Sequence, residues 1–491
     1  MATDHLSADT AWLHDAPGGK RGKTMLLWGD RVRTGDTSGG WVQVKARGDE
    51  GWVEQDKLGG PSLLEFYFID VGQGDGVLIR TPDHRHVMVD GGFTRGMQPS
   101  GKNAADFVDW KFVKDYGRTN IELDAMIASH NDADHFGGLW DLCSKEPSAA
   151  GELNAQGVTV EAFYHSGLSW WKDGARRTLG PFVDTPAGAM YTRLLGARAS
   201  AVTATSGGNA PQLHGDWGSF IGCLLKTKKR NGQPTPFRRL GDDTGFLPGF
   251  EPAAGAASIK VLGPPSHKVN GKPALRKFKG ADSINTNGQS SLLRVDYGRA
   301  RILLTGDLNT ESQLALLEHY QGQVQELECD VAKACHHGSD DVSYRFLQAL
   351  RPAVTVISSG DNESHDHPRP GIVAASATTG FLTIDKDRII SPLVYSTELS
   401  RSHKFSRTDL LTVKQDPEPA LELRNAALAR AAVRVKRISG KTNMLDLTEA
   451  LILSDLVYGL VNVRTDGEKI LCATMNEKDR SWKIKKIKSR F

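Results

Sequence analysis

The sequence lacks the features that mark secreted or membrane-spanning proteins. Its 491 residues include five cysteines, none in CxxC spacing, which argues for reduced thiols rather than a disulfide framework. No apolar run approaches the roughly 18 residues of a membrane-spanning helix, and the polar N-terminus has no signal pattern. The net charge of +3 is too small to identify a nucleic-acid-binding protein by itself. We therefore expect a cytoplasmic protein with no membrane partner.

The length predicts two or three domains, and the composition, 39% apolar and 24% charged, is that of a globular protein. Short alternating segments over 22–58, separated by Gly-Asp and Gly-Gly turns, are typical of a small β-barrel. This block resembles bacterial SH3-like modules, whose aromatic residues form the core or a groove for a protein or peptide partner. The expected domains are residues 1–60, 61–400 and 401–491.

The central domain has the rhythm of an α/β fold. Strands are expected in LLEFYFIDVGQGDGVLIRT, HVMVDGG and IELDAMIASH, with a helix near 103–116. The pattern is interrupted over about 144–285, which we interpret as an insertion that is partly loop. It returns as a hairpin over 290–309, helices near 310–322 and 341–350, and a strand over 352–360.

The segment after residue 400 has a different character. The sequence LELRNAALARAAVRVKRI predicts a helix over 421–438, and the last 35 residues predict a three-strand meander with Asp466-Gly467 at its first turn. We expect an α+β extension of the central domain.

The run His130-Asn131-Asp132-Ala133-Asp134-His135 carries the strongest chemical signal. It follows the apolar strand DAMIAS, and Phe136-Gly137-Gly138 comes directly after it. Divalent metals require several imidazole and carboxylate ligands at one point, and a strand that enters a tight turn supplies them from one segment. A bound cation would also relieve the repulsion between such closely spaced carboxylates. The sequence therefore predicts a metal site here.

The pattern His-x-Asp-x-Asp-His-x-Gly-Gly resembles the signature of the metallo-β-lactamase superfamily, with Asp rather than His at the second position. Together with four further motifs, the run resembles the hydrolase domain of the ComEC family of DNA-uptake proteins. These motifs are Phe68-Ile-Asp-Val-Gly-Gln-Gly-Asp75, Thr305-Gly306-Asp307, His336-His337-Gly338-Ser339 and His367-Pro368-Arg369-Pro370. The resemblance covers roughly residues 62–380 and implies an αββα sandwich. The membrane channel of that family is absent from the match.

The resemblance implies two divalent metal ions, zinc or manganese. His130 and Asp132 would hold one ion, and Asp307 would bridge both, although its position also fits a helix cap. The ligands implied for the other ion are Asp134, His135 and His367, with His365 as the competitor of His367.

The remaining residues of the motifs are expected to support catalysis. The resemblance places His337 beside the leaving group as a proton donor, with His336 as the alternative that faces the site. Asp132 or Asp134 could orient the attacking water. Asp75 and Asp90 follow strands near the motif and are expected to orient the histidine ligands, or to be turn residues.

One departure from the superfamily pattern concerns a further metal histidine that many members place between the first motif and the bridging aspartate. The candidates here are His165, His214 and His267, and His165 is the best placed because it follows a strand-like run. If none of them binds, the first site is oxygen-rich, and manganese becomes more plausible than tightly held zinc.

These observations predict a metal-dependent hydrolase, and we favour a phosphodiesterase or nuclease. Two basic stretches, 226–239 and 478–490, are compatible with a nucleic-acid partner, or with ordinary solvated surface. The alternatives are hydrolysis of a cyclic nucleotide or a lactone-type ester, and a partner-binding recognition protein in which hydrolysis is secondary.

Overall fold

The computed structural model of the chain describes residues 2–98, 100–144, 153–360, 367–397, 459–476 and 479–491, together with four short strands between 410 and 446. By contacts it divides into one large unit, residues 1–400 with 458–491, and a small unit, residues 401–457. Among the described residues, no helix is long and apolar enough to cross a membrane.

The N-terminal strands form one six-stranded antiparallel sheet in the order β1-β4-β5-β6-β2-β3. They are β1 (Ala2–His5), β2 (Thr10–His14), β3 (Gly22–Leu27), β4 (Arg31–Ser38), β5 (Trp41–Ala46) and β6 (Asp49–Glu54). Their alternate side chains enclose a small separate core that includes Leu13, Val32 and Val44. The strand-rich block is thus confirmed and begins before residue 22. Its likeness to SH3-like modules stays a prediction.

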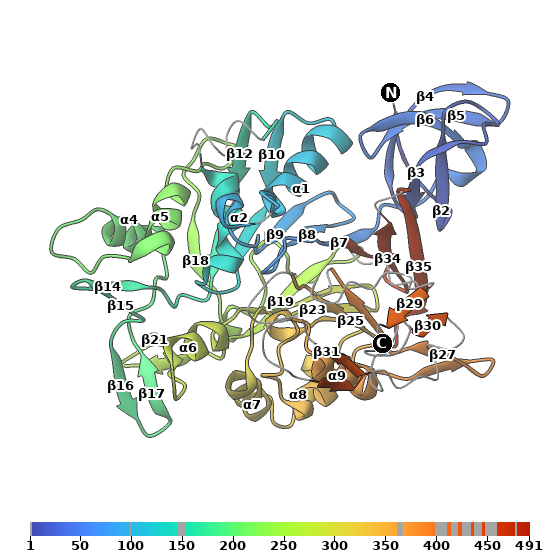
Figure 1. The fold of residues 1–491 in the computed structure, drawn as a ribbon. Helices are drawn as coiled ribbons and strands as arrows, with labels where there is room; N and C mark the ends of the chain where they lie inside the picture. The colour runs from blue at the N-terminus through green and yellow to red at the C-terminus, as the bar shows by residue number, and fades with distance from the viewer. Residues whose placement is uncertain are drawn as a thin grey trace. The chain divides into compact units, whose positions relative to one another are not determined.

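Two larger sheets form the centre of the molecule (Figure 1). The first has nine strands in the order β18-β13-β11-β9-β8-β7-β33-β34-β35. They are β7 (Leu64–Phe68), β8 (Val77–Arg80), β9 (His86–Val89), β11 (Ala125–Ala128), β13 (Phe163–His165), β18 (Phe237–Arg239), β33 (Val461–Thr465), β34 (Lys469–Asn476) and β35 (Ser481–Lys488). The predicted C-terminal meander is confirmed as β33–β35, and β33 pairs with β7, so these strands complete the central sheet.

The second sheet has six strands in the order β19-β22-β23-β24-β25-β28. They are β19 (Ser258–Gly263), β22 (Leu292–Tyr297), β23 (Ala300–Leu304), β24 (Val331–Lys333), β25 (Val354–Ile357) and β28 (Leu393–Ser396). The expected hairpin over 290–309 is β22 and β23, paired antiparallel.

The alternation of side chains along β7 shows how the layers pack. Phe66 and Phe68 point into a core that the two large sheets share, whereas Tyr67 points to a core on the other face. That outer core contains residues of α1 (Ala104–Trp110), α2 (Ala133–Cys143) and α5 (Gly215–Leu224). On the second sheet, Leu316 of α7 (Thr310–His319) and Phe346 of α8 (Tyr344–Leu350) pack against its outer face. The αββα sandwich is confirmed.

The predicted insertion over 144–285 is partly wrong, because it contains strands of both central sheets. β13 pairs parallel with β11 and with β18, and β19 pairs with β22. Strands of three residues carry too little periodicity to be recognised in a sequence. The rest of the segment forms α4 (Arg198–Thr205), α6 (Asp282–Gly288), β12 (Gly157–Val160), β14 (Trp171–Asp173), β15 (Arg176–Thr178), β16 (Phe182–Thr185), β17 (Gly188–Tyr191), β20 (His267–Val269) and β21 (Lys272–Arg276).

The smaller elements complete the described chain. These are β10 (Asn120–Leu123), α9 (Pro370–Thr379), β26 (Thr383–Asp385) and β27 (Arg388–Ser391). The small unit contains β29 (Leu410–Val413), β30 (Leu421–Arg424), β31 (Arg434–Lys436) and β32 (Met444–Asp446). The helix predicted over 421–438 is wrong at β30 and β31, which are strands, and its other residues lie outside the described residues.

Candidate metal centre

The metal motif lies in the turn between the buried strand β11 and the helix α2, which begins at Ala133. The loop between β7 and β8 packs directly on this turn. A Cβ at Gly74, whose φ is +112°, would lie 2.0 Å from the backbone oxygen of Asp134, so only glycine fits there. This close approach brings Asp75, the next residue, to the motif.

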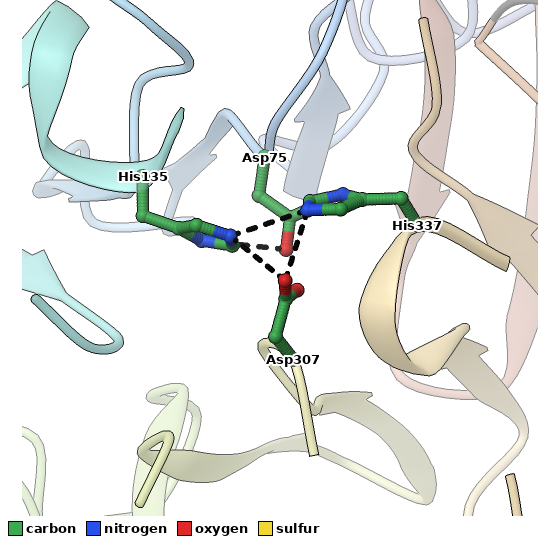
Figure 2. A group of neighbouring side chains, drawn as sticks. All are labelled: Asp75, His135, Asp307 and His337. Carbon is green, nitrogen blue, oxygen red and sulfur yellow. Dashed lines mark hydrogen bonds and ion pairs between the residues drawn. The ribbon is translucent and has the colours of Figure 1, made fainter. Parts of the chain in front are cut away.

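Four side chains converge on one point: Asp134, His135, Asp307 and His337, which we call the inner group. Figure 2 shows the last three of them. The Oδ2 atom of Asp307 lies 3.2 Å from Nε2 of His135 and 3.0 Å from Nε2 of His337. The two Nε2 atoms are 3.3 Å apart, and Oδ2 of Asp134 lies 3.5 Å from Nε2 of His337. Ligand atoms bound tetrahedrally at about 2.0 Å from one ion are separated by about 3.3 Å. The inner group therefore has the spacing of a metal site.

Two buried carboxylates hold the histidine rings from behind. Oδ2 of Asp90 lies 2.9 Å from Nδ1 of His135, and Oδ1 of Asp75 lies 3.3 Å from Nδ1 of His337. Asp75 also belongs to a cluster of four buried residues whose potential ligand atoms all lie within 4.8 Å of one another. Because Asp75 faces the Nδ1 atoms of His135 and His337, we assign it to the orientation of these two rings. The Nε2 atom of each ring is then directed at Asp307. This arrangement agrees with the role expected for both aspartates.

Lys333 is a member of the centre that the sequence did not indicate. It lies at the end of β24 and is 2% exposed. Its ammonium group forms an ion pair with Asp75, lies 3.6 Å from Oδ1 of Asp307, and donates a hydrogen bond of 2.9 Å to the Gly306 carbonyl. A lysine at a strand end has no distinctive spacing, so only the fold shows that it neutralises two site carboxylates.

The centre carries an excess of negative charge. Burial alone would lower the pKa of the His135 and His337 imidazoles, yet Asp307 and the carboxylates behind the rings raise both well above the ordinary value. Burial and the neighbouring Asp134 raise the pKa of Asp132 to about 6. A bound cation would counteract the raised pKa values of the two imidazoles and of Asp132, because it attracts the carboxylates and replaces the imidazole protons.

A second set of donors lies beside the first, and we call His130, Asp132 and His336 the outer group. Nε2 of His130 lies 3.6 Å from Oδ2 of Asp132, and Nε2 of His336 lies 4.0 Å from Oδ2 of Asp307. His130 is 1% exposed, and its Nε2 has no hydrogen-bond partner among the described residues. A buried imidazole nitrogen without a partner costs free energy unless a ligand satisfies it, and a cation would.

The segment from the end of α6 to β22, also missed in the sequence, supports the outer group. Thr286 donates a hydrogen bond of 2.7 Å to Oδ2 of Asp132, and Oγ of Ser290 lies 3.3 Å from Nδ1 of His130. Asn287 places its amide nitrogen 3.3 Å from Nε2 of His336. Small polar residues in a loop are too common to signal such a role.

His336 and His337 both adopt the left-handed backbone conformation, with φ of 47° and 53°. Non-glycine residues rarely do so, and each such residue costs about 1–3 kcal/mol, which is usually found at functional sites. The turn aims both Nε2 atoms at the same oxygen of Asp307.

The sequence also singles out three further histidines, His367, His365 and His165. Nε2 of His337 lies in the inner group, and the ring of His367, the ligand expected there, has its centroid 6.5 Å from that of His337. His365 lies outside the described residues. His165 contacts the rings of Phe163 and Trp217 and accepts a hydrogen bond from Gly167 N, and burial lowers its pKa to about 3. These contacts describe a packed histidine of β13.

The donor set fits divalent cations. The inner group offers two imidazoles and two carboxylates, and the outer group adds imidazole and carboxylate ligands around the shared Asp307. Mixed nitrogen and oxygen ligands suit zinc and manganese. The position of Asp307 between the groups agrees with the predicted bridge.

Comparison with known proteins agrees with this geometry. Residues 69–166 match the metallo-beta-lactamase superfamily. The chain is 37% identical over 102 residues to the competence protein ComA of Neisseria gonorrhoeae and 30% identical over 93 residues to the ComE operon protein 3 of Bacillus subtilis (strain 168). These matches cover 21% and 19% of this chain, and only 14% and 12% of the relatives' own lengths.

Among solved structures, a metal-dependent hydrolase of the beta-lactamase superfamily matches 68% of this chain and 95% of its own, at 12% identity and a TM-score of 0.30. The family match includes Asp75, Asp90 and the run from His130 to His135, whereas Asp307 and His337 lie outside it. Residues 69–166 of the chain therefore form a segment that matches the metallo-β-lactamase superfamily, and part of the chain is related in sequence to these competence proteins.

Proposed function

We propose that this domain is a phosphodiesterase that cleaves nucleic acid through attack of a water molecule on phosphorus. The observation that carries the proposal is the convergence of two donor groups on Asp307, with Asp132 in the outer group where many superfamily members have a histidine. This variant, together with the four further motifs, is the basis of the resemblance to the hydrolase domain of the ComEC family. The relationship to competence proteins supports the same assignment.

The residues of the centre have distinct tasks in this reaction. The inner group would hold one divalent cation, and the outer group with Asp307 would hold a second. Such cations would supply the Lewis acidity that activates water and stabilises charge at the attacked phosphorus. Asp75 and Asp90 fix the rings of His135 and His337 for this purpose. Lys333 limits the repulsion between Asp75 and Asp307.

We assign His337 to the inner group rather than to the expected protonation of the leaving group, because its side chain is 3% exposed and its Nε2 lies 3.0 Å from Oδ2 of Asp307. An imidazole nitrogen that binds a cation has no proton to donate there. Asp132, 27% exposed at its side chain, is more accessible than Asp134 at 15%, so we assign the orientation of water to Asp132.

The two basic stretches contribute unequally to the proposal. Within 226–239, Arg230 forms ion pairs with Asp124 at 2.5 Å and Glu161 at 3.1 Å, and Lys229 lies 3.8 Å from Glu161. These charges are compensated locally. The second stretch carries exposed lysines on the edge strand β35, a pattern that also protects an edge from aggregation. Neither stretch decides the substrate.

The first test is hydrolysis of bis(p-nitrophenyl) phosphate, single-stranded DNA and duplex DNA by the full chain with added Mn²⁺. We expect turnover of the small diester and of DNA, abolished by EDTA, since the carboxylates and histidines cannot activate water alone. The matched control is the Asp134→Ala/His135→Ala variant, which should be inactive. Turnover of the small diester without any nucleic acid would reassign the substrate to a small molecule, and no turnover of either would contradict the phosphodiesterase proposal.

Replacement of His336 by alanine is expected to weaken binding of a second metal ion by at least about tenfold, because the outer group loses a nitrogen ligand. Binding at the outer site requires His336 to give up its contact with the Asn287 amide. Co²⁺ titration followed by visible absorption, with metal content per chain, measures both sites independently of activity.

The matched control is His165→Ala, at the histidine that superfamily spacing favours. We expect it to retain both ions, since His165 packs within β13. If His336→Ala bound two ions as tightly as the unaltered chain while His165→Ala lost one, the assignment of the outer group would be wrong.

A further inference from the structure

The hairpin formed by β14 and β15 carries like charges directly opposite each other. In its antiparallel register Lys172 is paired with Arg177, so their side chains share one face, and both are exposed. Like charges in this arrangement destabilise a strand pair. Asp173 stands opposite Arg176 on the other face. One face of the hairpin is therefore purely cationic.

This hairpin is joined to the metal motif through two buried tryptophans. The Nε1 atom of Trp170 donates a hydrogen bond of 3.1 Å to the carbonyl oxygen of Asn131, inside the metal motif. The guanidinium of Arg177 lies 4.1 Å from the centroid of the Trp170 ring. Arg193 approaches the Trp171 ring at 5.5 Å. In Figure 1 the hairpin projects to the left of the two large sheets. Arg177 is thus connected to the metal motif through Trp170.

The charges of this surface are not compensated locally. Among the described residues, no carboxylate lies within 4.0 Å of the cationic groups of Lys172, Arg177 or Arg193, in contrast to the paired Arg230. Contact with a tryptophan face restricts the guanidinium while leaving its N–H donors available. Lys172 and Arg177 are exposed and Arg193 is half-buried, and cations without a nearby carboxylate are suited to bind an anionic chain.

We propose that Lys172, Arg177 and Arg193 form a cationic arm that binds the phosphodiester backbone of a nucleic-acid substrate on one side of the scissile bond. This inference rests on the proposed function and adds the surface that binds the nucleic-acid substrate. Guanidinium and ammonium groups bind backbone phosphates without reading the bases, and release of condensed counterions drives the association. The arm selects for chain length, since a mononucleotide diester does not reach it from the centre.

The test compares the unaltered chain with the Lys172→Ala/Arg177→Gln variant. Binding of labelled 20-nucleotide DNA and RNA is measured by fluorescence anisotropy in EDTA, where no cleavage occurs, over a series of salt concentrations. Loss of two phosphate contacts should reduce the slope of log affinity against log salt by about 1.4 for a single strand. The ratio of kcat/KM for the oligonucleotide to that for bis(p-nitrophenyl) phosphate should fall at least tenfold.

Two further variants serve as controls for charge and for folding. Lys485→Ala/Lys488→Ala removes two exposed charges from β35 and should leave the salt slope unchanged. Arg193→Gln alone covers the case in which the double variant fails to fold, with an expected slope change of about 0.7. An unchanged slope in both arm variants would overturn the arm. Turnover of bis(p-nitrophenyl) phosphate with no binding of either oligonucleotide would overturn the arm while leaving the phosphodiester chemistry intact.

Discussion

Replacement of Asp307 by asparagine is expected to lower kcat for bis(p-nitrophenyl) phosphate by at least about a thousandfold, or about 4 kcal/mol of transition-state stabilisation. The reason is that one oxygen, Oδ2, faces both groups: it lies 3.2 Å from Nε2 of His135, 3.0 Å from that of His337 and 4.0 Å from that of His336. An amide has nearly the same shape but no negative charge. It therefore removes the bridge with little change in packing.

The measurement pairs kcat with metal content per chain and with the thermal unfolding profile. Asp296→Asn serves as the control, because Asp296 lies on the same sheet and pairs with Arg294 at 3.0 Å, away from the metal motif. We expect the control to retain activity within about twofold, since Asp296 pairs with Arg294 and with no residue of the metal centre. Retention of kcat within tenfold by Asp307→Asn, with unchanged metal content, would refute a bridging role.

Much of the fold could be predicted because its determinants are local. The strand before His130 is a short apolar run that ends near charged residues, and Asp90 likewise follows a buried strand, whereas Asp75 lies in the loop just before β8. Carboxyl ends of neighbouring parallel strands meet at one edge of a sheet, so side chains that follow them come together. The motifs together resemble one superfamily, and this resemblance predicted the fold that connects them. The αββα arrangement followed from the same pattern of strands and helices.

Other features of the site depend on backbone conformations and long-range pairings that sequence patterns do not encode. The position of Nε2 of His337 in the inner group depends on the left-handed turn at His336 and His337, which no common propensity predicts. Lys333 becomes a site residue only because β24 pairs between β23 and β25. The strands β13 and β18 have three residues each and are recognisable only through their partners.

A second large effect is expected for Arg464→Met, which should lower the free energy of unfolding by about 3–5 kcal/mol. Arg464 of β33 is fully buried, and its guanidinium lies 2.7 Å from Oδ1 of Asp30 and 3.7 Å from Oε2 of Glu65. It also donates a hydrogen bond of 2.7 Å to the Trp28 carbonyl. Removal of the cation would leave two buried carboxylates with one arginine each, Asp30 with Arg47 and Glu65 with Arg80.

The lowered pKa values of Asp30 and Glu65 support the same prediction. Burial alone would raise the pKa of Asp30, but Arg464 and then Arg47 lower it far below the ordinary value, and the pKa of Glu65 is lowered by Arg464 and Arg80 against burial. Carboxyls whose folded pKa is lowered stabilise the fold above their unfolded pKa, and this stabilisation disappears as the pH falls. The Arg464→Met variant should therefore lose stability chiefly above about pH 4.5.

Denaturant unfolding of the full chain measures this effect, with Arg480→Met as the matched control. Arg480 pairs with Asp49 at 2.9 Å, but its side chain is 58% exposed, so its loss should cost less than about 1 kcal/mol. Removal of residues 1–58 would be a poorer test, because it would also uncover Leu471 and Trp482, which pack against the N-terminal strands. Equal small effects of both arginine substitutions would mean that apolar packing, and not this ion cluster, joins the N-terminal sheet to the central sheet.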